Sequence, residues 1–139
     1  MIADCAASKR ITLLKSHAIT FGRLHTWTLI FFYDKRRDFL RIKAPWPDRG
    51  AWVELEDKIR VEVDPQTGDG LAFEIEDFRR GFLTKRPYLA PLWEQVQPTP
   101  IALRRMESTP FISAFLHEME RLIYQRVPQL DPADLKAAP

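Results

Sequence analysis

The chain has 139 residues, of which 45% are hydrophobic and 29% are charged, and its formal net charge is +2. This length is enough to bury the core of one domain without a disulfide framework or a structural metal. Cys5 is the single cysteine, which rules out a disulfide within the chain and favours a reducing compartment, the cytoplasm. The longest apolar run, residues 29–33, is far shorter than the roughly 20 residues of a membrane-spanning helix, and residues 1–10 lack the apolar core of a signal peptide.

The first half of the chain alternates apolar and polar residues between turn signals, which is the period of a strand with one buried face. Residues 1–10 are expected to form a flexible tail, and residues 18–33 favour one or two strands, the last over 27–33. A polar turn over 34–38 joins this strand to a second one over 39–44. Residues 45–50 end the second strand, because they contain two prolines and a glycine.

Three further strands are predicted over residues 52–56, 59–63 and 71–75. Asp57 and Lys58 form a tight turn or a short break between the first two. Residues 64–70 form a hairpin loop, because Pro65 suits the start of a turn and Gly68 and Gly70 tolerate positive φ. This loop does not have the spacing of oxygen ligands that a calcium loop needs.

Two helices are predicted in the second half. Glu76 and Asp77 are expected to cap a short helix over 78–85, which Pro87 ends. A longer helix over 109–127 has Ser108 or Thr109 as its cap and a broad apolar face that repeats every three or four residues. Its apolar residues are Phe111, Ile112, Phe115, Leu116, Met119, Leu122, Ile123 and Val127. Its polar side holds His117, Glu118, Glu120, Arg121 and Gln125.

The segment between these helices, residues 87–101, contains four prolines and predicts an extended crossing segment held by its aromatic residues. The predicted fold is therefore α+β: an antiparallel β-meander of about five or six strands, packed on one face by the C-terminal amphipathic helix and the short helix. We expect one domain over residues 11–128, with a flexible N-terminal tail over 1–10 and a flexible C-terminal tail over 129–139.

Charge is segregated along the chain. Residues 1–47 hold nine Lys or Arg against three Asp or Glu, whereas residues 48–78 hold three against ten. One interpretation is cross-strand pairing on the solvent face, for example of Arg41 and Lys43 with Glu54, Glu56 or Glu62. The other is a bipolar surface that docks a charged partner or a second copy of the chain.

Basic residues are clustered at several positions. Lys35, Arg36 and Arg37 lie on the predicted hairpin tip, and Arg79–Arg80, Lys85–Arg86 and Arg104–Arg105 form adjacent pairs. Exposed aromatic residues beside such clusters would give nucleic-acid bases a surface to stack on. The sequence offers four for this role: Trp46, Trp52, Tyr88 and Trp93. Ordinary solvated surface charge is the alternative interpretation.

Catalytic and metal-binding patterns are weak. His17, His25 and His117 have no metal-ligand spacing, and the sequence His117-Glu118-Met-Glu-Arg121 lacks the second histidine of a zinc motif. The crowded carboxylates Glu74, Glu76 and Asp77 are the one acid–base candidate, with a solvated face plus a helix start as the alternative. No cofactor, metal or small-molecule ligand is indicated, and no catalytic residue is assigned.

The middle of the chain resembles a small bacterial family catalogued as domain of unknown function 2283. The resemblance is carried by Tyr33-Asp34, by residues 38–42, by residues 59–64, by Thr67-Gly68-Asp69-Gly70 and by Phe73-Glu74-Ile75. It covers about 45 residues of the strand region, and the predicted C-terminal helix departs from it. The resemblance implies a small α+β sheet domain with no known activity, so it assigns no functional residues.

Together these patterns favour a small non-enzymatic protein-interaction module or accessory subunit that self-associates. The first alternative is a nucleic-acid-binding protein that uses Lys35, Arg36 and Arg37. The second is an enzyme of unknown reaction.

Overall fold

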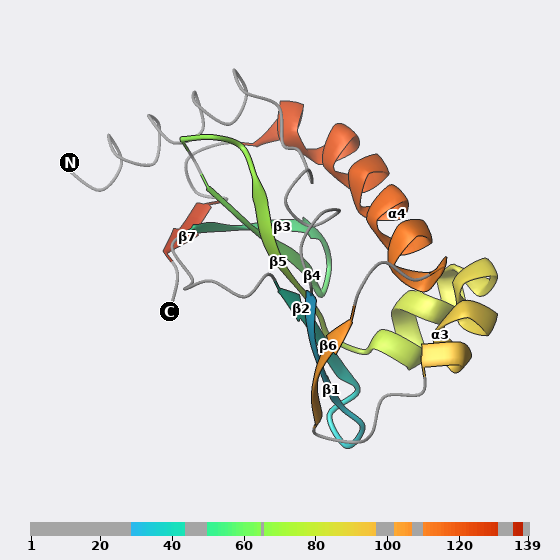
Figure 1. Ribbon diagram of the computed structural model, residues 1–139. Helices are drawn as coiled ribbons and strands as arrows, with labels where there is room; N and C mark the ends of the chain where they lie inside the picture. Colours follow the sequence, from blue (N-terminus) through green and yellow to red (C-terminus); the bar gives the residue numbers. More distant parts are fainter. Residues whose placement is uncertain are drawn as a thin grey trace.

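The computed structural model describes residues 29–43, 50–64, 66–96, 102–106, 110–130 and 135–137, with the backbone alone over 102–106 and 135–137. The predicted N-terminal tail, any strand within residues 18–28, most of the proline-containing turn after residue 44 and the helix cap at Ser108 or Thr109 lie outside the described residues. Among the described elements, one sheet carries helices on one of its faces (Figure 1).

The sheet contains seven antiparallel strands in the order β6-β1-β2-β5-β4-β3-β7. The strands are β1 (Leu29–Asp34), β2 (Phe39–Lys43), β3 (Ala51–Glu56), β4 (Ile59–Val63), β5 (Gly70–Ile75), β6 (Ala102–Met106) and β7 (Leu135–Ala137). The α+β class and the hairpins predicted at residues 34–38 and 64–70 are confirmed, and residues 57–58 form a tight turn between β3 and β4. Because β5 lies between β2 and β4, the connection from β2 to β3 passes two strands instead of joining neighbours.

The turns follow the chemistry of their residues. The Asp34 carboxylate accepts hydrogen bonds from the backbone N–H groups of Arg36 and Arg37 at 3.0 and 3.2 Å, which closes the β1–β2 turn. Positive φ angles occur at Asp38, Lys58 and Gly68, one in each of the three hairpin connections. Glycine adopts such angles without steric cost, and the two polar residues accept them where the turn requires it.

The helices cover one face of the sheet, which we call the inner face. The π-helix η1 (Phe78–Leu83), the 3-10 helix η2 (Pro87–Leu89), the α-helix α3 (Ala90–Val96), the long α4 (Pro110–Arg126) and the 3-10 helix η3 (Val127–Gln129) follow the strands in the chain. The predicted helices over 78–85 and 109–127 are thus present. In Figure 1, α4 and α3 lie on the same side of the strands.

The core lies between the inner face and these helices. Alternate residues of β1 and β2 are buried, and the apolar face predicted for α4 is buried over residues 111–123. Aromatic rings meet at its centre. The Trp93 and Phe78 rings and the Phe73 and Phe115 rings pack edge to face, with centroids 4.7 and 5.4 Å apart. The Trp93 and Phe111 rings are tilted, with centroids 5.2 Å apart. Burying a large apolar side chain stabilises the folded state by about 1.5–3 kcal/mol, so this layer is the main source of stability.

Two predictions about the second half are wrong. Residues 87–96 form η2 and α3 instead of an extended segment, because Pro87 and Pro91 fall in first turns, where no backbone N–H is needed. Residues 129–139 are not simply a flexible tail, since Leu130 is buried and β7 pairs with β3.

The β1–β2 turn is attached to η1 by Asp38, which is only 4% exposed. Its carboxylate accepts the backbone N–H groups of Arg79 and Arg80 at 2.9 to 3.0 Å and the Tyr33 hydroxyl at 2.7 Å. Burial alone would raise the pKa of Asp38, but the hydrogen bonds from Arg80, Arg79 and Tyr33 hold it below its usual value. The prediction that Asp77 caps this helix is therefore wrong: its side chain makes no capping hydrogen bond, and the Asp38 carboxylate makes these bonds instead.

Candidate functional site

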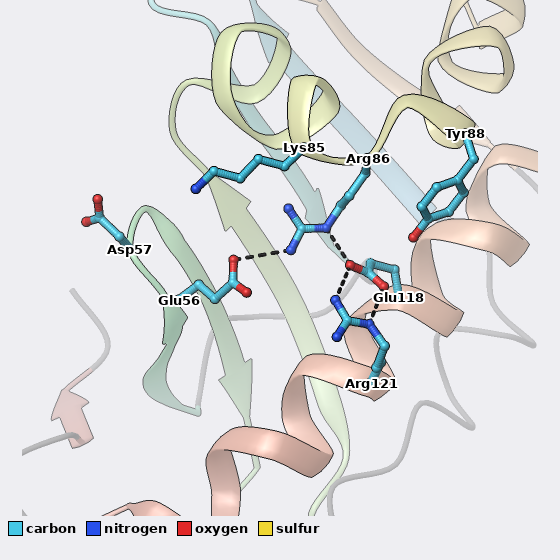
Figure 2. A pocket seen from close by; sticks show the side chains of 7 residues that line it. All are labelled: Glu56, Asp57, Lys85, Arg86, Tyr88, Glu118 and Arg121. Atoms are coloured by element: carbon cyan, nitrogen blue, oxygen red, sulfur yellow. Dashed lines mark hydrogen bonds and ion pairs between the residues drawn. The ribbon is translucent and has the colours of Figure 1, made fainter.

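A cleft of about 630 Å³ lies where the middle of α4 faces the β3–β4 turn, and we call it the α4 cleft. Its charged side chains come from three parts of the chain: the end of β3, the segment between η1 and η2, and α4 (Figure 2). The lining residues are Glu56, Asp57, Lys85, Arg86, Tyr88, Glu118 and Arg121.

Glu118 is the centre of this cleft. The sequence placed it on the polar side of the helix, yet its side chain is only 5% exposed. Arg86 donates its Nε–H to Glu118, and Arg121 binds both carboxylate oxygens at 2.8 Å. Arg86 also reaches Glu56 at 3.2 Å and lies over the Phe82 ring at 4.4 Å. Charges of alternating sign thus run from Glu56 through Arg86 and Glu118 to Arg121.

This arrangement fixes the protonation states. The hydrogen bonds from Arg121, and next those from Arg86, lower the pKa of Glu118 to about 2 although burial opposes them. The same bond raises the pKa of Arg121. Burial, followed by the nearby Glu118 charge, raises the pKa of Tyr88, whose hydroxyl points toward Glu118 in Figure 2. A carboxylate held ionised by two guanidinium groups is poorly suited to accept and release protons near neutral pH.

The three carboxylates that the sequence grouped as an acid–base candidate are engaged separately. Glu74 lies between Arg41 at 3.6 Å and Arg60, whereas Asp77 binds Lys58 and Arg80. Glu76 is exposed. Glu74 lines one hollow, and Glu76 and Asp77 line another, so the structure does not bring the three together.

A second candidate site lies on the sheet face opposite the helices, over β1 and β2. We call it the outer hairpin face, and it surrounds a hollow of about 230 Å³. It consists of Ile30, Phe32, Phe39, Arg41, Lys43 and Glu74. All six side chains are half-buried. The Phe32 and Phe39 rings meet edge to face with centroids 6.5 Å apart, which fixes two aromatic rings at a partly open surface.

The basic tip, which consists of Lys35, Arg36 and Arg37, lies beside this face in the turn between β1 and β2. All three residues are exposed. Arg37 places its guanidinium 5.2 Å from the centre of the Phe39 ring, a cation–π contact that joins the tip to the face. In Figure 1 this turn extends below the helices, at the lower end of the view. The sequence located the tip correctly, and its role in nucleic-acid binding stays a prediction.

The aromatic residues available for stacking differ from those expected. Trp52 and Trp93 are buried, and Trp46 lies outside the described residues. Tyr88 is 57% exposed, but it lies at the α4 cleft. Phe32 and Phe39 were missed, although the alternation that buries Phe31 and Leu40 places both on the opposite face together with Arg41.

The predicted cross-strand charge pairing is present with a different partner. In the register of the sheet, Arg41 of β2 stands opposite Glu74 of β5, and Glu74 stands opposite Arg60 of β4. Arg41 binds Glu74 rather than Glu54, Glu56 or Glu62, because β5 separates β2 from β4 and β3. The segregated charges of the sequence are therefore partly neutralised within the sheet.

The other basic residues that are adjacent in sequence differ in whether they are bound within the fold or exposed. Arg79 binds Glu94 at 3.4 Å, and Arg86 is buried in the α4 cleft, whereas Lys85 is exposed. Within the part of the chain that the structure describes, no cluster of three metal-ligating side chains forms. No helix among the described residues is long and apolar enough to cross a membrane.

Comparison with known proteins found no matching family model, no matching curated protein and no matching solved structure. The resemblance of the strand region to domain of unknown function 2283 therefore stays untested.

Proposed function

We propose that this protein is a small non-enzymatic interaction module, an accessory subunit in the cytoplasm, and that it recognises its partner through the outer hairpin face and the basic tip. One observation carries the proposal: Ile30, Phe32 and Phe39 surround a hollow on a sheet face that none of the described helices covers. Apolar side chains next to exposed charges are typical of surfaces that bind macromolecules.

The two candidate sites differ in what they offer a partner. In the α4 cleft, the two arginines, Arg86 and Arg121, already donate hydrogen bonds to the Glu118 carboxylate. The cleft therefore supports a bracing role that holds α4 against the sheet. The outer hairpin face combines open apolar area with a positively charged rim, which supports recognition.

Charge favours an acidic partner over a second copy of the chain at this face. Two copies packed face to face would each bring an Arg41–Glu74 pair and Lys43 to the contact, so the excess charge on both sides would be positive. Like charges in an interface are strongly unfavourable. Self-association, which the sequence favours, is thus proposed to use another surface. A protein with an acidic patch or a nucleic acid would both complement the outer hairpin face.

The experiment is a pull-down of the tagged protein from source-cell extract, divided into nuclease-treated and untreated halves. We expect the wild-type protein to retain a partner that Phe32→Gln loses. The control is Tyr124→Gln, which changes a 79% exposed aromatic residue on α4 and should retain the partner. Equal retention by both variants, with both folded, would contradict the assignment of the outer hairpin face.

A further inference from the structure

We propose that the partner of this face is single-stranded nucleic acid, with the phosphate backbone on the basic tip and bases against Phe32 and Phe39. This inference rests on the proposed function, because it names the chemistry of the partner that the outer hairpin face would bind. Four observations support it: the exposed tip, the half-buried rings at a partly open surface, the contact of Phe39 with Arg37, and the hollow beside the rings.

The basic tip provides the electrostatic part of the binding. Lys35, Arg36 and Arg37 are consecutive, so three cations are exposed within one turn. Two carboxylates flank the tip in sequence. Asp34 accepts backbone N–H groups of this turn, and Asp38 accepts those of Arg79 and Arg80. A cluster of this kind attracts phosphates and releases the counterions condensed on them. Its binding weakens as the salt concentration rises, because releasing these counterions is then less favourable.

The rings provide the part that distinguishes a single strand from a duplex. Bases of a single strand are free to stack on aromatic side chains, which contributes to affinity without requiring a particular sequence. Bases in a duplex are already stacked on one another, so a duplex would contact the tip through its phosphates alone. Phe32 and Phe39 lie on neighbouring strands, and Phe39 is also covered in part by Arg37, which can stack on a base as well.

The face is long enough for a short stretch of nucleotides. The five residues of β2 span about 17 Å at the rise of an antiparallel strand. Phe39 lies at the tip end of this strand and Lys43 at the other end, with Arg41 between them on the same face. A strand that enters at the basic tip would therefore pass the rings and the Arg41–Glu74 pair and end beside Lys43.

The experiment measures fluorescence anisotropy of a fluorescein-labelled 15-nucleotide oligothymidine and of a labelled duplex of the same length, over a series of salt concentrations. Three variants are compared with the wild type. Lys35→Gln/Arg36→Gln removes two charges from the tip. Lys58→Gln/Lys85→Gln removes two exposed charges outside the tip and the outer hairpin face as a matched control. Phe32→Leu/Phe39→Leu keeps apolar volume at the face but removes both rings.

We expect the wild type to bind the single strand more tightly than the duplex. The tip variant should lose about tenfold in affinity at low salt, and the slope of log affinity against log salt should become shallower by about 1.4 for two lost phosphate contacts. The ring variant should lose at least about fivefold on the single strand and little on the duplex. The matched control should stay close to the wild type.

The proposal is overturned if the wild type does not bind the single strand at low salt, or if the tip variant and the matched control weaken equally. The unfolding free energy of each variant, measured in urea, separates loss of binding from loss of fold. A nuclease-treated pull-down in parallel separates this proposal from the proposed function. A protein partner that the wild type retains and Phe32→Leu/Phe39→Leu loses, with no oligonucleotide binding, overturns the nucleic-acid inference alone. If Phe32→Leu/Phe39→Leu retains the protein partner and still binds the oligonucleotide like the wild type, both the nucleic-acid inference and the proposed function are overturned.

Discussion

The α4 cleft and the basic tip are both rich in cations, but they use them in opposite ways. In the cleft, Arg86 is 6% exposed at its side chain and is bound by Glu118 and Glu56. At the tip, Lys35 and Arg36 are exposed, and the adjacent Asp34 carboxylate binds backbone N–H groups. The same residue types therefore serve as a structural brace in one region and as available charge in the other.

The comparison teaches that a cluster of basic residues is informative only when its partners are known. The arginine guanidinium donates several hydrogen bonds in a fixed planar geometry. A buried arginine such as Arg86 is therefore held in place by the carboxylates that accept them. An exposed pair contributes little to stability, and exposed cations without such acceptors are available to a partner. The predictions that follow test whether the two regions are separable in this way.

The largest expected effect is at the centre of the α4 cleft. Glu118→Gln keeps the shape of the side chain but leaves Arg86 buried without a full counter-charge, so the free energy of unfolding should fall by about 3–5 kcal/mol. Urea unfolding followed by tryptophan fluorescence measures this change. Glu94→Gln, which removes the partner of Arg79 at an exposed pair, is the control and should cost less than about 1 kcal/mol. Equal losses in the two variants would contradict a bracing role.

The same carboxylate should make stability depend on pH. Its pKa is lowered from 4.5 to about 2 by folding, so its contribution is present above the unfolded pKa and is lost as pH falls. We expect a loss of about 3 kcal/mol between pH 5 and pH 2, by the relation between pKa shifts and free energy. Asp38, whose pKa is also lowered, adds to the loss in the same direction. Urea unfolding at several pH values should give a shallower dependence in Glu118→Gln, and parallel curves would refute the assignment.

A smaller effect is expected where the hairpin is attached to η1. Asp38→Asn keeps one carbonyl acceptor but loses the charge and one acceptor for the Arg79 and Arg80 backbone, so stability should fall by about 2 kcal/mol. Thermal and urea unfolding measure this loss. The control is Asp57→Asn at an exposed turn position, which should change stability by less than about 0.5 kcal/mol. An unaffected Asp38→Asn protein would show that the hairpin base does not depend on this carboxylate.

The smallest effect is expected at the basic tip. Replacing Lys35, Arg36 and Arg37 together with Gln should lower the free energy of unfolding by no more than about 1 kcal/mol. The three side chains are exposed, and the contact of Arg37 with the Phe39 ring contributes about 0.5–1 kcal/mol. The same urea titration measures it. A loss of 2 kcal/mol or more would place the tip with the α4 cleft, as a structural cluster, and would end the contrast between the two regions.

Local patterns predicted the hairpins and the long helix. Alternation and turn residues are properties of a few adjacent positions, so the strands around Asp34, Lys58 and Gly68 and the buried face of α4 were found. The order of strands was not, because β2 pairs with β5 across about 30 intervening residues. α3 was missed because its prolines suggested an extended segment, although Leu89, Trp93 and Val96 repeat at helical spacing and are all buried.

The sites were predictable to a lesser degree. The basic tip followed directly from the turn that carries it. Glu118 gave no local signal, since its burial depends on Arg86, which lies 32 positions earlier in the chain. Phe32 and Phe39 carry a local signal, because in an alternating strand the aromatic residues that share a face with Arg41 lie away from the core.

The contact from Asp38 to Arg79 and Arg80 also has a consequence for the order of folding. The carboxylate that caps η1 belongs to a turn 41 residues earlier, so the first turn of this helix has no local cap of its own. Helix nucleation is unfavourable without such support, whereas a hairpin with a short turn closes within microseconds. We expect the β1–β2 hairpin to form first and to template η1 afterwards, so Asp38 should have a low φ-value and its loss should mainly speed unfolding.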